Sequence, residues 1–562
     1  MRWCCSRLPD QHTSKLSSRI SAQDNPSMAT GKTEQSEAFI LHEKVLKGRD
    51  YPLFILLLSL SLAASLYFVR HWISDGVRAA FPLFFFLTTL VLTLKLIEHF
   101  ARLLMLPLMR RPRPLAVCPG YKVAVVTTFV PGGEPVEMLE RTLKALLALK
   151  YPHDTWVLDE GDDEGVRSLC VKLGAHHFSR KKISRYQAES GVFQRRSKHG
   201  NYNAWFYELG FDRYDIITGF DPDHIPQTDF LMKVLGYFAD PKIGYVQAPA
   251  AYYNQQSSFI AGGAAEETYS YYSCTQMAAN AFGYPFVTGC HNTHRVRALK
   301  DAGGFAPHDA DDLLLTLVYK NRGWRGVYVP EILARGLAPV DWAVYLTQQL
   351  RWARSIIDVK LRLAPRLTKN ISLKDRLITL LDVVVYLQSS MTWLFCLALL
   401  SLMLAMQVRL MSLSSGTVYG FVGLCAILQL CVFYRQRFFL DPPSERGLYW
   451  KARILRYAKW PYTLLALIDV ARGRRVPYML TRKIKSEGRQ FLLWPHALVA
   501  LLISAAWMIG VFSGHTLHPS LHLFAAVIVI GSFALLLSER MSFPDPYGKS
   551  PALLVEEGAG SL

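Results

Sequence analysis

The chain has 562 residues, more than a single folded unit needs, and its formal net charge at pH 7 is +19. Hydrophobic residues make up 51% of the chain and are concentrated in blocks, which excludes an ordinary soluble protein. The basic residues follow the edges of these blocks and do not gather on one face of a soluble domain, so we expect no nucleic-acid partner.

The N-terminal segment is rich in Ser, Gln and Lys and has no apolar stretch at its centre. We therefore expect residues 1–40 to be disordered and not to act as a secretory signal. Met28 is a second candidate for the start of translation, beside Met1. Nine cysteines are spread along the chain without paired spacing, so the sequence predicts neither a zinc site nor a disulfide framework.

Six apolar blocks are long enough to cross a bilayer, for which about 20 residues are needed. They are Tyr51–Val69, Ala79–Ile97, Ile378–Met406, Gly416–Tyr434, Phe491–Phe512 and Leu521–Ser538. Lys and Arg precede the first block, follow the second and fill the segment between the fourth and fifth. Because cytoplasmic loops are enriched in these residues, we expect a multi-pass plasma (inner) membrane protein with both termini and its large domain in the cytosol. Membrane lipids are expected partners of the basic loops.

Strand and helix patterns alternate between the second and third blocks. Lys122–Phe129 predicts a strand and Val136–Leu149 a helix. Two further predicted strands, Thr155–Leu158 and Tyr214–Gly219, run into acidic residues. The first of four such motifs, called stations below, is Trp156-Val-Leu-Asp-Glu160. Such acids at strand ends are typical of ligand sites in open α/β sheets, so the pattern predicts an α/β domain that binds a nucleotide. The pair Gly132-Gly133 is better explained by a tight turn than by phosphate contact.

The second acidic station is Phe220-Asp-Pro-Asp-His224. Two carboxylates separated by one residue can share a hard divalent cation that also binds diphosphate, which predicts Mg²⁺ or Mn²⁺ on Asp221 and Asp223. A solvated loop is the common alternative for Asp-x-Asp, but the apolar run before it favours the metal site. The histidines of His291-Asn-Thr-His294 lack a third ligand in the sequence, and we interpret them as ordinary polar residues.

A third station, Ala310-Asp-Asp312, stands at the head of a predicted helix, Leu313–Lys320. Transfer of a sugar to a hydroxyl needs a base, and we assign that role to Asp312. The alternative for an Asp at this position is a helix cap, a role that suits Asp311 better. The fourth station, Gln348-Gln-Leu-Arg-Trp352, lies in a segment typical of an interfacial amphipathic helix. Arg351 can neutralise a leaving diphosphate, and the ring of Trp352 can lie against a sugar.

These stations, in this order, resemble the motifs of processive family-2 glycosyltransferases, particularly cellulose synthase catalytic subunits. The resemblance covers roughly residues 120–360 and extends to Tyr478-Met-Leu-Thr-Arg-Lys483, which is similar to the gating-loop motif Phe-x-Val-Thr-x-Lys. It implies a GT-A-like, Rossmann-related mixed sheet in the cytosol, inserted into a transmembrane bundle of about six helices. It also implies a UDP-sugar donor and a growing glycan as acceptor.

The resemblance assigns further roles to residues of this chain. It implies a catalytic base at Asp312 and a metal at Asp221 and Asp223. Nucleotide binding is implied for Asp159, Glu160, Lys198, Asp221, Arg351, Thr481 and Lys483. Acceptor binding is implied for Gly289, Cys290, Gln348 and Trp352. Glu160, Asp311 and Cys290 depart from the motifs that they match, which puts the identity of the sugar in doubt more than the activity.

The predicted organisation follows from the blocks and stations together. It comprises the disordered segment 1–40, two spans within 41–113, the glycosyltransferase domain 114–340, interfacial helices 341–375, two spans within 376–435, an interfacial segment with the gating loop 436–490, two spans within 491–540 and a tail 541–562. From the short tail we expect no cyclic-dinucleotide-binding domain after the last span.

The sequence thus predicts an inverting, metal-dependent enzyme that elongates a β-linked polysaccharide and passes it through its own membrane helices. UDP-glucose is the favoured donor. UDP-N-acetylglucosamine, for a chitin- or hyaluronan-type polymer, and a single addition to a lipid are the enzymatic alternatives. A non-catalytic scaffold of a polysaccharide synthase complex is the alternative of a different class, and accessory synthase subunits are candidate partners in either case.

Overall fold

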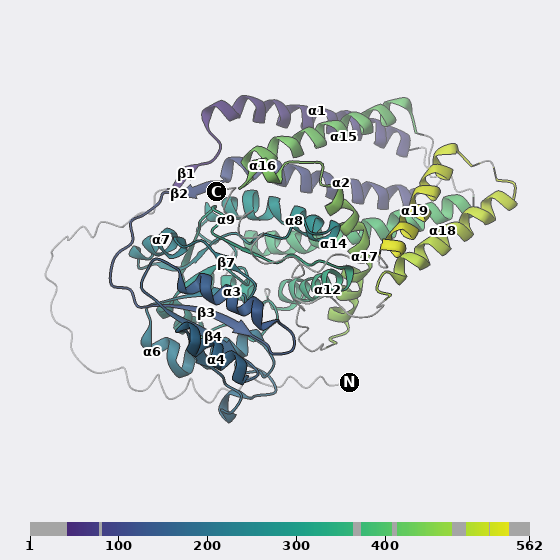
Figure 1. Ribbon diagram of the computed structural model, residues 1–562. Helices are drawn as coiled ribbons and strands as arrows, with labels where there is room; N and C mark the ends of the chain where they lie inside the picture. Colours follow the sequence, from purple (N-terminus) through teal and green to yellow (C-terminus); the bar gives the residue numbers. More distant parts are fainter. Residues whose placement is uncertain are drawn as a thin grey trace. The chain divides into compact units, whose positions relative to one another are not determined.

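The computed structural model describes residues 42–77, 81–363, 373–406, 413–474, 491–515 and 517–538, with residues 373–385 described by their backbone alone. A seven-stranded sheet forms the core of the water-facing part (Figure 1). Its order is β11-β8-β10-β6-β3-β4-β5. The strands are β3 (Val123–Phe129), β4 (Asp154–Asp159), β5 (His176–Phe178), β6 (Ile216–Phe220), β8 (Ile243–Gln247), β10 (Asn292–Arg295) and β11 (Arg325–Tyr328).

The sheet is mixed, as predicted. β3 pairs in parallel with β4 and β6, and β4 pairs in parallel with β5. β10 runs antiparallel to both of its neighbours, β6 and β8. The side chains of β3 are buried on both faces except at Thr128, which is the pattern of a central strand covered by helices on both sides.

Two hydrophobic cores lie on opposite faces of this sheet. On one face, α3 (Val136–Leu147) and α4 (Glu164–Leu173) pack apolar side chains such as Leu143 and Val166 against β3 and β4. α4 begins because the Asp163 carboxylate accepts a hydrogen bond from the Val166 amide at 3.0 Å, and it ends at Gly174 in the left-handed conformation. On the other face lie α5 (Lys198–Trp205), α10 (Val296–Ala302) and α11 (Asp311–Asn321).

A small second sheet joins segments that are far apart in sequence. β12 (Ala334–Gly336) pairs antiparallel with β7 (Ile225–Pro226) and parallel with β9 (Ala251–Tyr252). This pairing brings Gly336 against the ring of His224: a Cβ at position 336 would lie 1.9 Å from His224 Nε2. The close approach therefore requires glycine at position 336.

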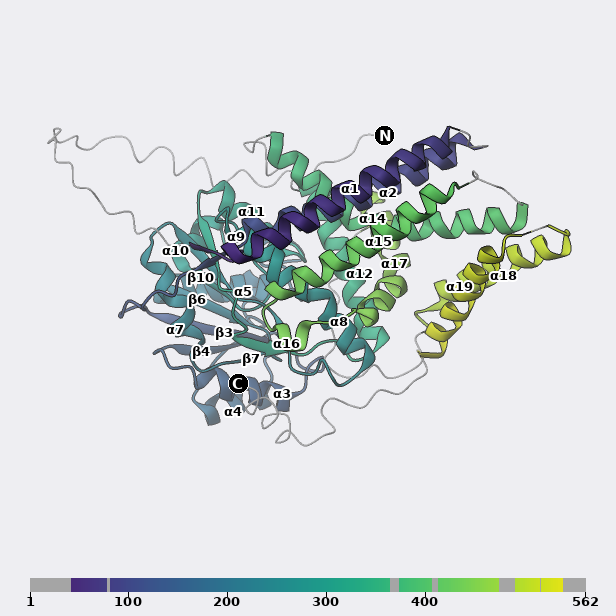
Figure 2. The same cartoon turned by 90° about the horizontal axis from the view of Figure 1, so that it is seen from above.

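Among the described residues, six helices are long and apolar enough to cross a membrane, as predicted. The candidate spans are Gly48–Gly76, Pro82–Leu108, Tyr386–Met406, Ser415–Phe438, Trp494–Phe512 and Pro519–Ser538. They belong to α1 (Tyr51–Gly76), α2 (Pro82–Leu104), α14 (Leu373–Met406), α15 (Ser415–Arg435), α18 (Trp494–Phe512) and α19 (Pro519–Ser538). α1 packs along α15, and α18 packs against α19 (Figures 1 and 2).

The chain before the first span is tied to the chain after the second. β1 (His42–Lys44), which precedes α1, pairs antiparallel with β2 (Arg110–Pro112), which follows α2. The two strands form a ribbon. The segments flanking this helical pair therefore lie at the same end of it.

The segment between spans four and five, for which the sequence predicts an interfacial position, contains a long helix, α17 (Trp450–Ala471). It packs against α8 (Phe259–Ser270), α12 (Trp342–Asp358) and α14. Buried side chains of α8, α12 and α17 share one core, including Ile260, Tyr345 and Leu455. Polar contacts reinforce it, because Lys459 Nζ donates to Glu267 Oε2 at 2.9 Å and to Gln349 Oε1 at 2.8 Å. α12, which carries the fourth station, is held in this way against α17.

Candidate active site

The first station lies at the end of β4. Asp159 is fully buried, and its carboxylate accepts hydrogen bonds from the amides of Gly161 at 2.8 Å and Asp163 at 2.6 Å. His177 Nε2 lies 3.1 Å from the second carboxylate oxygen. The side chain thus holds the turn between β4 and α4. Its predicted contact with the nucleotide stays a prediction.

Glu160 has a structural partner that the sequence did not reveal. Arg180, fully buried, donates from Nε to Glu160 Oε2 at 3.0 Å and from Nη2 to Glu160 Oε1 at 2.8 Å. The same guanidinium donates to the carbonyl oxygens of Tyr186, Phe193 and Ser197. The amide of Arg196 also donates to Glu160, at 2.9 Å. The Glu160–Arg180 pair therefore fixes the loop that leads into α5.

Lys198 begins α5 and joins three of the predicted site residues. The helix starts there because the Ser197 hydroxyl accepts a hydrogen bond from the Gly200 amide at 3.1 Å. Lys198 Nζ donates to Asp221 Oδ1 at 2.5 Å and to the Gly289 carbonyl at 2.6 Å. Burial lowers the pKa of the Lys198 ammonium, but its interactions with Asp221, Tyr202 and Asp311 together outweigh burial and hold the pKa well above the usual value. Lys198 is therefore a permanent cation at the site.

Asp221, Asp223 and His224 follow β6 and can offer one ligand atom each, all within 4.8 Å of one another. Asp223 is 1% exposed, and its Oδ2 accepts a hydrogen bond from the Leu337 amide at 2.9 Å. Asp221 is half-buried and faces Lys198. Two carboxylates beside an imidazole, one of them buried and oriented by a backbone amide, fit a divalent cation. The sequence predicts the two carboxylates as ligands but not the imidazole.

Asp312 lies beside the same cluster. A Cβ at Gly289 would lie 3.6 Å from Asp312 Oδ2 and 3.8 Å from Lys198 Nζ, so this exposed glycine lies between the base candidate and the cation. Burial raises the pKa of Asp312, and burial together with the Asp312 charge raises that of Asp311 to about 7. Ala310, not Asp311, is the N-cap residue of α11, whereas Asp311 Oδ1 accepts from the Asp312 amide at 2.9 Å.

The fourth station lies on α12. The positive charge of Arg351 acts on Asp312 and lowers its pKa, against the larger effect of burial, so Arg351 is within electrostatic range of the base candidate. Gln348 is half-buried one turn earlier on the helix, and the side chain of Trp352 is 39% exposed. An exposed indole next to Arg351 on the same helix is suited to contact a sugar ring. Thr481 and Lys483 of the predicted gating loop lie outside the described residues.

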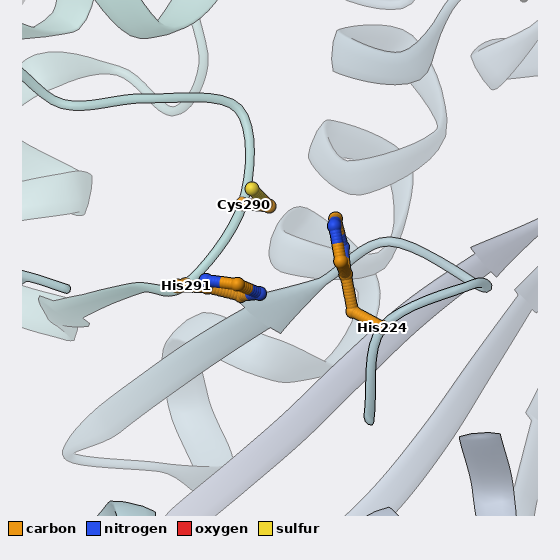
Figure 3. Close-up of side chains that lie close together, drawn as sticks. All are labelled: His224, Cys290 and His291. Carbon is orange, nitrogen blue, oxygen red and sulfur yellow. The ribbon is translucent and has the colours of Figure 1, made fainter. Parts of the chain in front are cut away.

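Cys290 and His291 join the site from the loop before β10. The His291 amide donates to the Gly219 carbonyl at 3.0 Å, which fastens this loop to the end of β6. Cys290, His291 and His224 form a second group whose ligand atoms lie within 4.8 Å of one another (Figure 3). His294, by contrast, bonds to Asn292 and Tyr319 inside the core beneath α11. In the sequence, His291 and His294 belong to one short motif and were interpreted as ordinary polar residues. In the structure, His291 lies beside His224 instead.

The arrangement brings together a cation, a candidate metal group and a carboxylate with a raised pKa next to the end of β6. Such a set can bind a diphosphate, neutralise the charge of a leaving group and remove a proton from a hydroxyl. The sequence predicted neither the pairing of Glu160 with Arg180 nor the place of His224 beside Asp223 and His291. Arg180 and His291 are distant in the chain from Glu160 and His224, and an alternation of strands and helices gives no signal for such pairs.

The part of the chain that carries the candidate site resembles known proteins in sequence. Residues 119–355 match the family model described as "Glycosyltransferase like family 2". Cellulose synthase 2 of Novacetimonas hansenii is 26% identical over 328 residues, which are 56% of this chain and 20% of that protein. The UDP-forming cellulose synthase catalytic subunit of Xanthomonas axonopodis pv. citri (strain 306) is 26% identical over 281 residues, 48% of this chain and 36% of that protein.

The chain thus covers about a fifth to a third of the length of these curated relatives. Among solved structures, the mannosyltransferase PcManGT from Pyrobaculum calidifontis, in complex with GDP-Man and Mn²⁺, superposes with a TM-score of 0.44 at 15% identity. That superposition covers 70% of this chain and 99% of the mannosyltransferase.

Proposed function

We propose that this chain is an inverting, metal-dependent enzyme that elongates a β-linked polysaccharide from a UDP-sugar. The premise is its glycosyltransferase domain of the family-2 type. One observation carries the proposal. Lys198 contacts both Asp221 and Gly289, and Gly289 lies against Asp312, so the groups for a diphosphate, a metal and a base meet at one place.

The donor side of the reaction is assigned to the ends of β4 and β6. Asp159 would face the uridine end of the donor, and Lys198 would bind its diphosphate. Asp221 and Asp223 would hold Mg²⁺ or Mn²⁺, which supplies positive charge to the departing diphosphate. Glu160 contributes indirectly, because its pairing with Arg180 fixes the loop before Lys198. Thr481 and Lys483, outside the described residues, would close over the nucleotide.

On the acceptor side, Asp312 would take the proton of the attacking hydroxyl. Burial raises its pKa toward neutral pH, which suits a base that must accept and then release a proton. Arg351, on the neighbouring helix α12, would balance the negative charge that develops on the leaving group. Attack from the side opposite the leaving UDP would invert the configuration at the anomeric carbon.

Gly289, Cys290, Gln348 and Trp352 would border the growing glycan. Gly289 is exposed between Lys198 and Asp312, and Trp352 offers an exposed ring on α12. Because α12 packs against α17, a glycan bound along α12 would lie near the helix that precedes span five. We propose that the product leaves along this path through the membrane helices.

The location proposed for the protein is the plasma (inner) membrane, with the glycosyltransferase domain and both termini in the cytosol. The basic residues around the spans support this orientation. The β1–β2 ribbon supports it as well, since it puts the chain before span one and the chain after span two at the same end. Accessory synthase subunits and membrane lipids remain proposed partners.

UDP-glucose is the favoured donor because the relatives reported above are named cellulose synthases. UDP-N-acetylglucosamine and a single-addition reaction on a lipid are the enzymatic alternatives, and a non-catalytic scaffold is the alternative of another class. The test is to incubate the purified protein in lipid with a panel of labelled UDP-sugars and Mg²⁺ or Mn²⁺. The product is then sized and digested with linkage-specific hydrolases.

A polymer made from one donor and cut by one β-specific hydrolase supports the proposal and identifies the sugar. A single sugar on a lipid would replace polymerisation by the single-addition reaction. No incorporation from any donor, by protein that still binds UDP, would favour the scaffold. The Asp312→Asn variant, prepared in the same way, controls for a contaminating transferase.

A further inference from the structure

Three buried side chains that the proposed reaction does not need as a set meet beside the donor site. His224, Cys290 and His291 are 5%, 8% and 0% exposed. Each can place one nitrogen or sulfur atom within 4.8 Å of those of the other two. Figure 3 shows the His291 ring extending from its loop toward His224, with Cys290 next to it on the same loop.

The protonation of His291 can be read from its hydrogen bonds. Nδ1 lies 2.8 Å from the carbonyl oxygen of Pro249, and a carbonyl only accepts, so Nδ1 carries the proton. The lone pair is therefore on Nε2. That atom is buried and has no hydrogen-bond partner within the described part of the chain. A buried nitrogen left in this way calls for an explanation, because a buried polar group normally has a partner.

The backbone of His291 is held in an unusual conformation. Its φ angle is 54°, in the left-handed region that non-glycine residues seldom adopt. The hydrogen bond from its amide to Gly219 and the one from its Nδ1 to Pro249 both maintain this geometry. Such strain tends to be kept where a side chain must point in one direction. Here that direction is toward His224, whose ring centroid lies 4.6 Å away at an interplanar angle of 69°.

His224 is positioned as firmly as His291. Its ring lies against the backbone of Gly336, where no side chain could fit, and it shares a candidate metal group with Asp221 and Asp223. Two sets of ligands therefore meet at His224. The set with Asp221 and Asp223 offers mostly oxygen, and the set with Cys290 and His291 offers nitrogen and sulfur.

We propose that His224, Cys290 and His291 bind a borderline divalent cation of the Zn²⁺ class, separate from the hard cation held by Asp221 and Asp223. Two imidazoles and a thiolate are ligands that Zn²⁺ prefers, whereas Mg²⁺ prefers oxygen. The hydrogen bond from His291 Nδ1 to a carbonyl is the kind of outer contact that orients metal-binding histidines. The nearby Asp223 carboxylate balances the remaining positive charge.

The distances are compatible with this assignment after a small adjustment. Zn–N bonds of about 2.0–2.1 Å and Zn–S bonds of about 2.3 Å place tetrahedral ligands roughly 3.5 Å apart. Side-chain rotations that shorten the present separations by about an ångström would suffice. Three protein ligands leave a fourth position for water, as in zinc sites that are open on one side.

The proposal also bears on the acceptor loop, a point that rests on the proposed function. Cys290 follows Gly289, whose carbonyl accepts from Lys198. A cation on Cys290 and His291 would fasten this loop to the segment after β6 that carries Asp223. Zn²⁺ would therefore alter transfer through the position of Gly289, without replacing Mg²⁺ or Mn²⁺ on the carboxylates.

Co²⁺ is the probe that tests the site, because its absorption reports sulfur ligation and does not require activity. The full-length protein, purified in detergent and freed of metal with a chelator, is titrated with Co²⁺ in the presence of excess Mg²⁺. We expect one equivalent to bind with a thiolate-to-Co²⁺ charge-transfer band that Zn²⁺ abolishes and Mg²⁺ does not. The absence of this band, or its loss on addition of Mg²⁺, would overturn the proposal.

Matched variants locate the site. Cys290→Ser should abolish the charge-transfer band, and His291→Asn, which tolerates the left-handed backbone, should weaken Co²⁺ binding at least tenfold. Cys170→Ser is the control, because Cys170 is also buried but belongs to α4, which packs on one face of the sheet. It should keep the band, as should Asp312→Asn. A band that survives Cys290→Ser would overturn the assignment.

A measurement on the unaltered protein covers the case in which Cys290→Ser fails to fold. X-ray absorption of the Zn²⁺-loaded protein should show one sulfur at about 2.3 Å together with nitrogen at about 2.0–2.1 Å. A shell made only of oxygen and nitrogen would contradict the site. Failure of the proposed function would appear separately, as a protein that binds Co²⁺ through Cys290 but transfers no sugar.

Discussion

Arg180 and Glu160 form a two-pronged ion pair in which the buried guanidinium donates from Nε at 3.0 Å and from Nη2 at 2.8 Å. Parallel hydrogen bonds of this kind depend on the planar fork of arginine, which lysine cannot reproduce. The same guanidinium holds three backbone carbonyls of the loop that ends at Lys198. The pair therefore connects the stability of the domain with the position of a donor-site cation.

We predict that Arg180→Lys lowers the free energy of unfolding by about 2–4 kcal/mol, because one partner of a buried pair loses most of its hydrogen bonds. Thermal unfolding of the purified protein measures the change. Arg185→Lys is the matched control, since Arg185 pairs with Glu208 at the surface and exposed pairs contribute little. Equal melting temperatures for Arg180→Lys and the unaltered protein would contradict the structural role of the pair.

Asp312→Asn should reduce the rate of sugar transfer by about 10²–10⁴-fold, because the amide cannot accept the proton of the attacking hydroxyl. Binding of UDP should change little, since the candidate donor ligands lie on other elements. Incorporation of labelled sugar and a UDP-binding isotherm measure the two effects. Asp311→Asn, one residue away, should cost much less. A normal rate in Asp312→Asn would remove this residue from the base role.

The pH dependence of transfer should show an acidic limb above the ordinary range of a carboxyl group. A base works only when deprotonated, and burial raises the pKa of Asp312. As the pH is lowered, the rate should therefore begin to fall at a higher pH than an ordinary aspartate would give. Initial rates at saturating donor across the acidic and neutral pH range measure the profile. An acidic limb that lies within the ordinary range of an aspartate would contradict a raised pKa at the base.

Asp311 should make the stability of the folded protein depend on pH, with the higher stability at acidic pH. Burial and the neighbouring Asp312 charge raise its pKa in the folded state to about 7, above its unfolded value. Its contribution to stability is therefore complete at acidic pH and is lost as the pH rises through about 7. Asp311→Asn, which cannot ionise, should consequently unfold at a higher temperature relative to the unaltered protein at pH 8 than at pH 5. An equal difference at both pH values would exclude this effect.

Gly336→Ala should displace His224, because the added Cβ would lie 1.8 Å from its Cδ2 atom. Overpacking of this kind costs about 1–3 kcal/mol of stability and should also weaken cation binding beside Asp223. Gly447→Ala is the control, since a Cβ there meets nothing within 4 Å. Thermal unfolding together with a Mn²⁺ titration of activity distinguishes the two variants. Identical behaviour of both would show that His224 can move without cost.

Removal of divalent cations with EDTA should abolish transfer, and Mg²⁺ or Mn²⁺ should restore it. Asp223→Asn should raise the cation concentration needed for half-maximal activity by at least tenfold, because a buried ligand loses its charge. Asp229→Asn, an acidic residue just before α7 (Phe230–Val234) and outside both candidate metal groups, is the control. Undiminished activity in EDTA would contradict the metal dependence.

The sequence predicted the features that depend only on residues close together in the chain. The apolar blocks gave the six candidate spans, and the runs before Asp159 and Asp221 gave strands that end where expected. Features that depend on distant pairing could not be predicted. β10 enters the sheet between β6 and β8, and only this insertion brings Cys290 and His291 to His224. The partnership of Arg180 with Glu160 and the glycine at position 336 are hidden for the same reason.

In the proposed reaction, the contact between Lys198 and Asp221 would make donor and metal binding interdependent. A diphosphate that recruits Lys198 and a cation that recruits Asp221 must each break the same ion pair. Whichever arrives first releases the partner group for the other, so each should raise the affinity for the other by the same factor. UDP without a divalent cation, or the cation without UDP, should consequently bind more weakly than either does in the other's presence. The resting charge balance of the site thus acts as a check that both components are present before transfer begins.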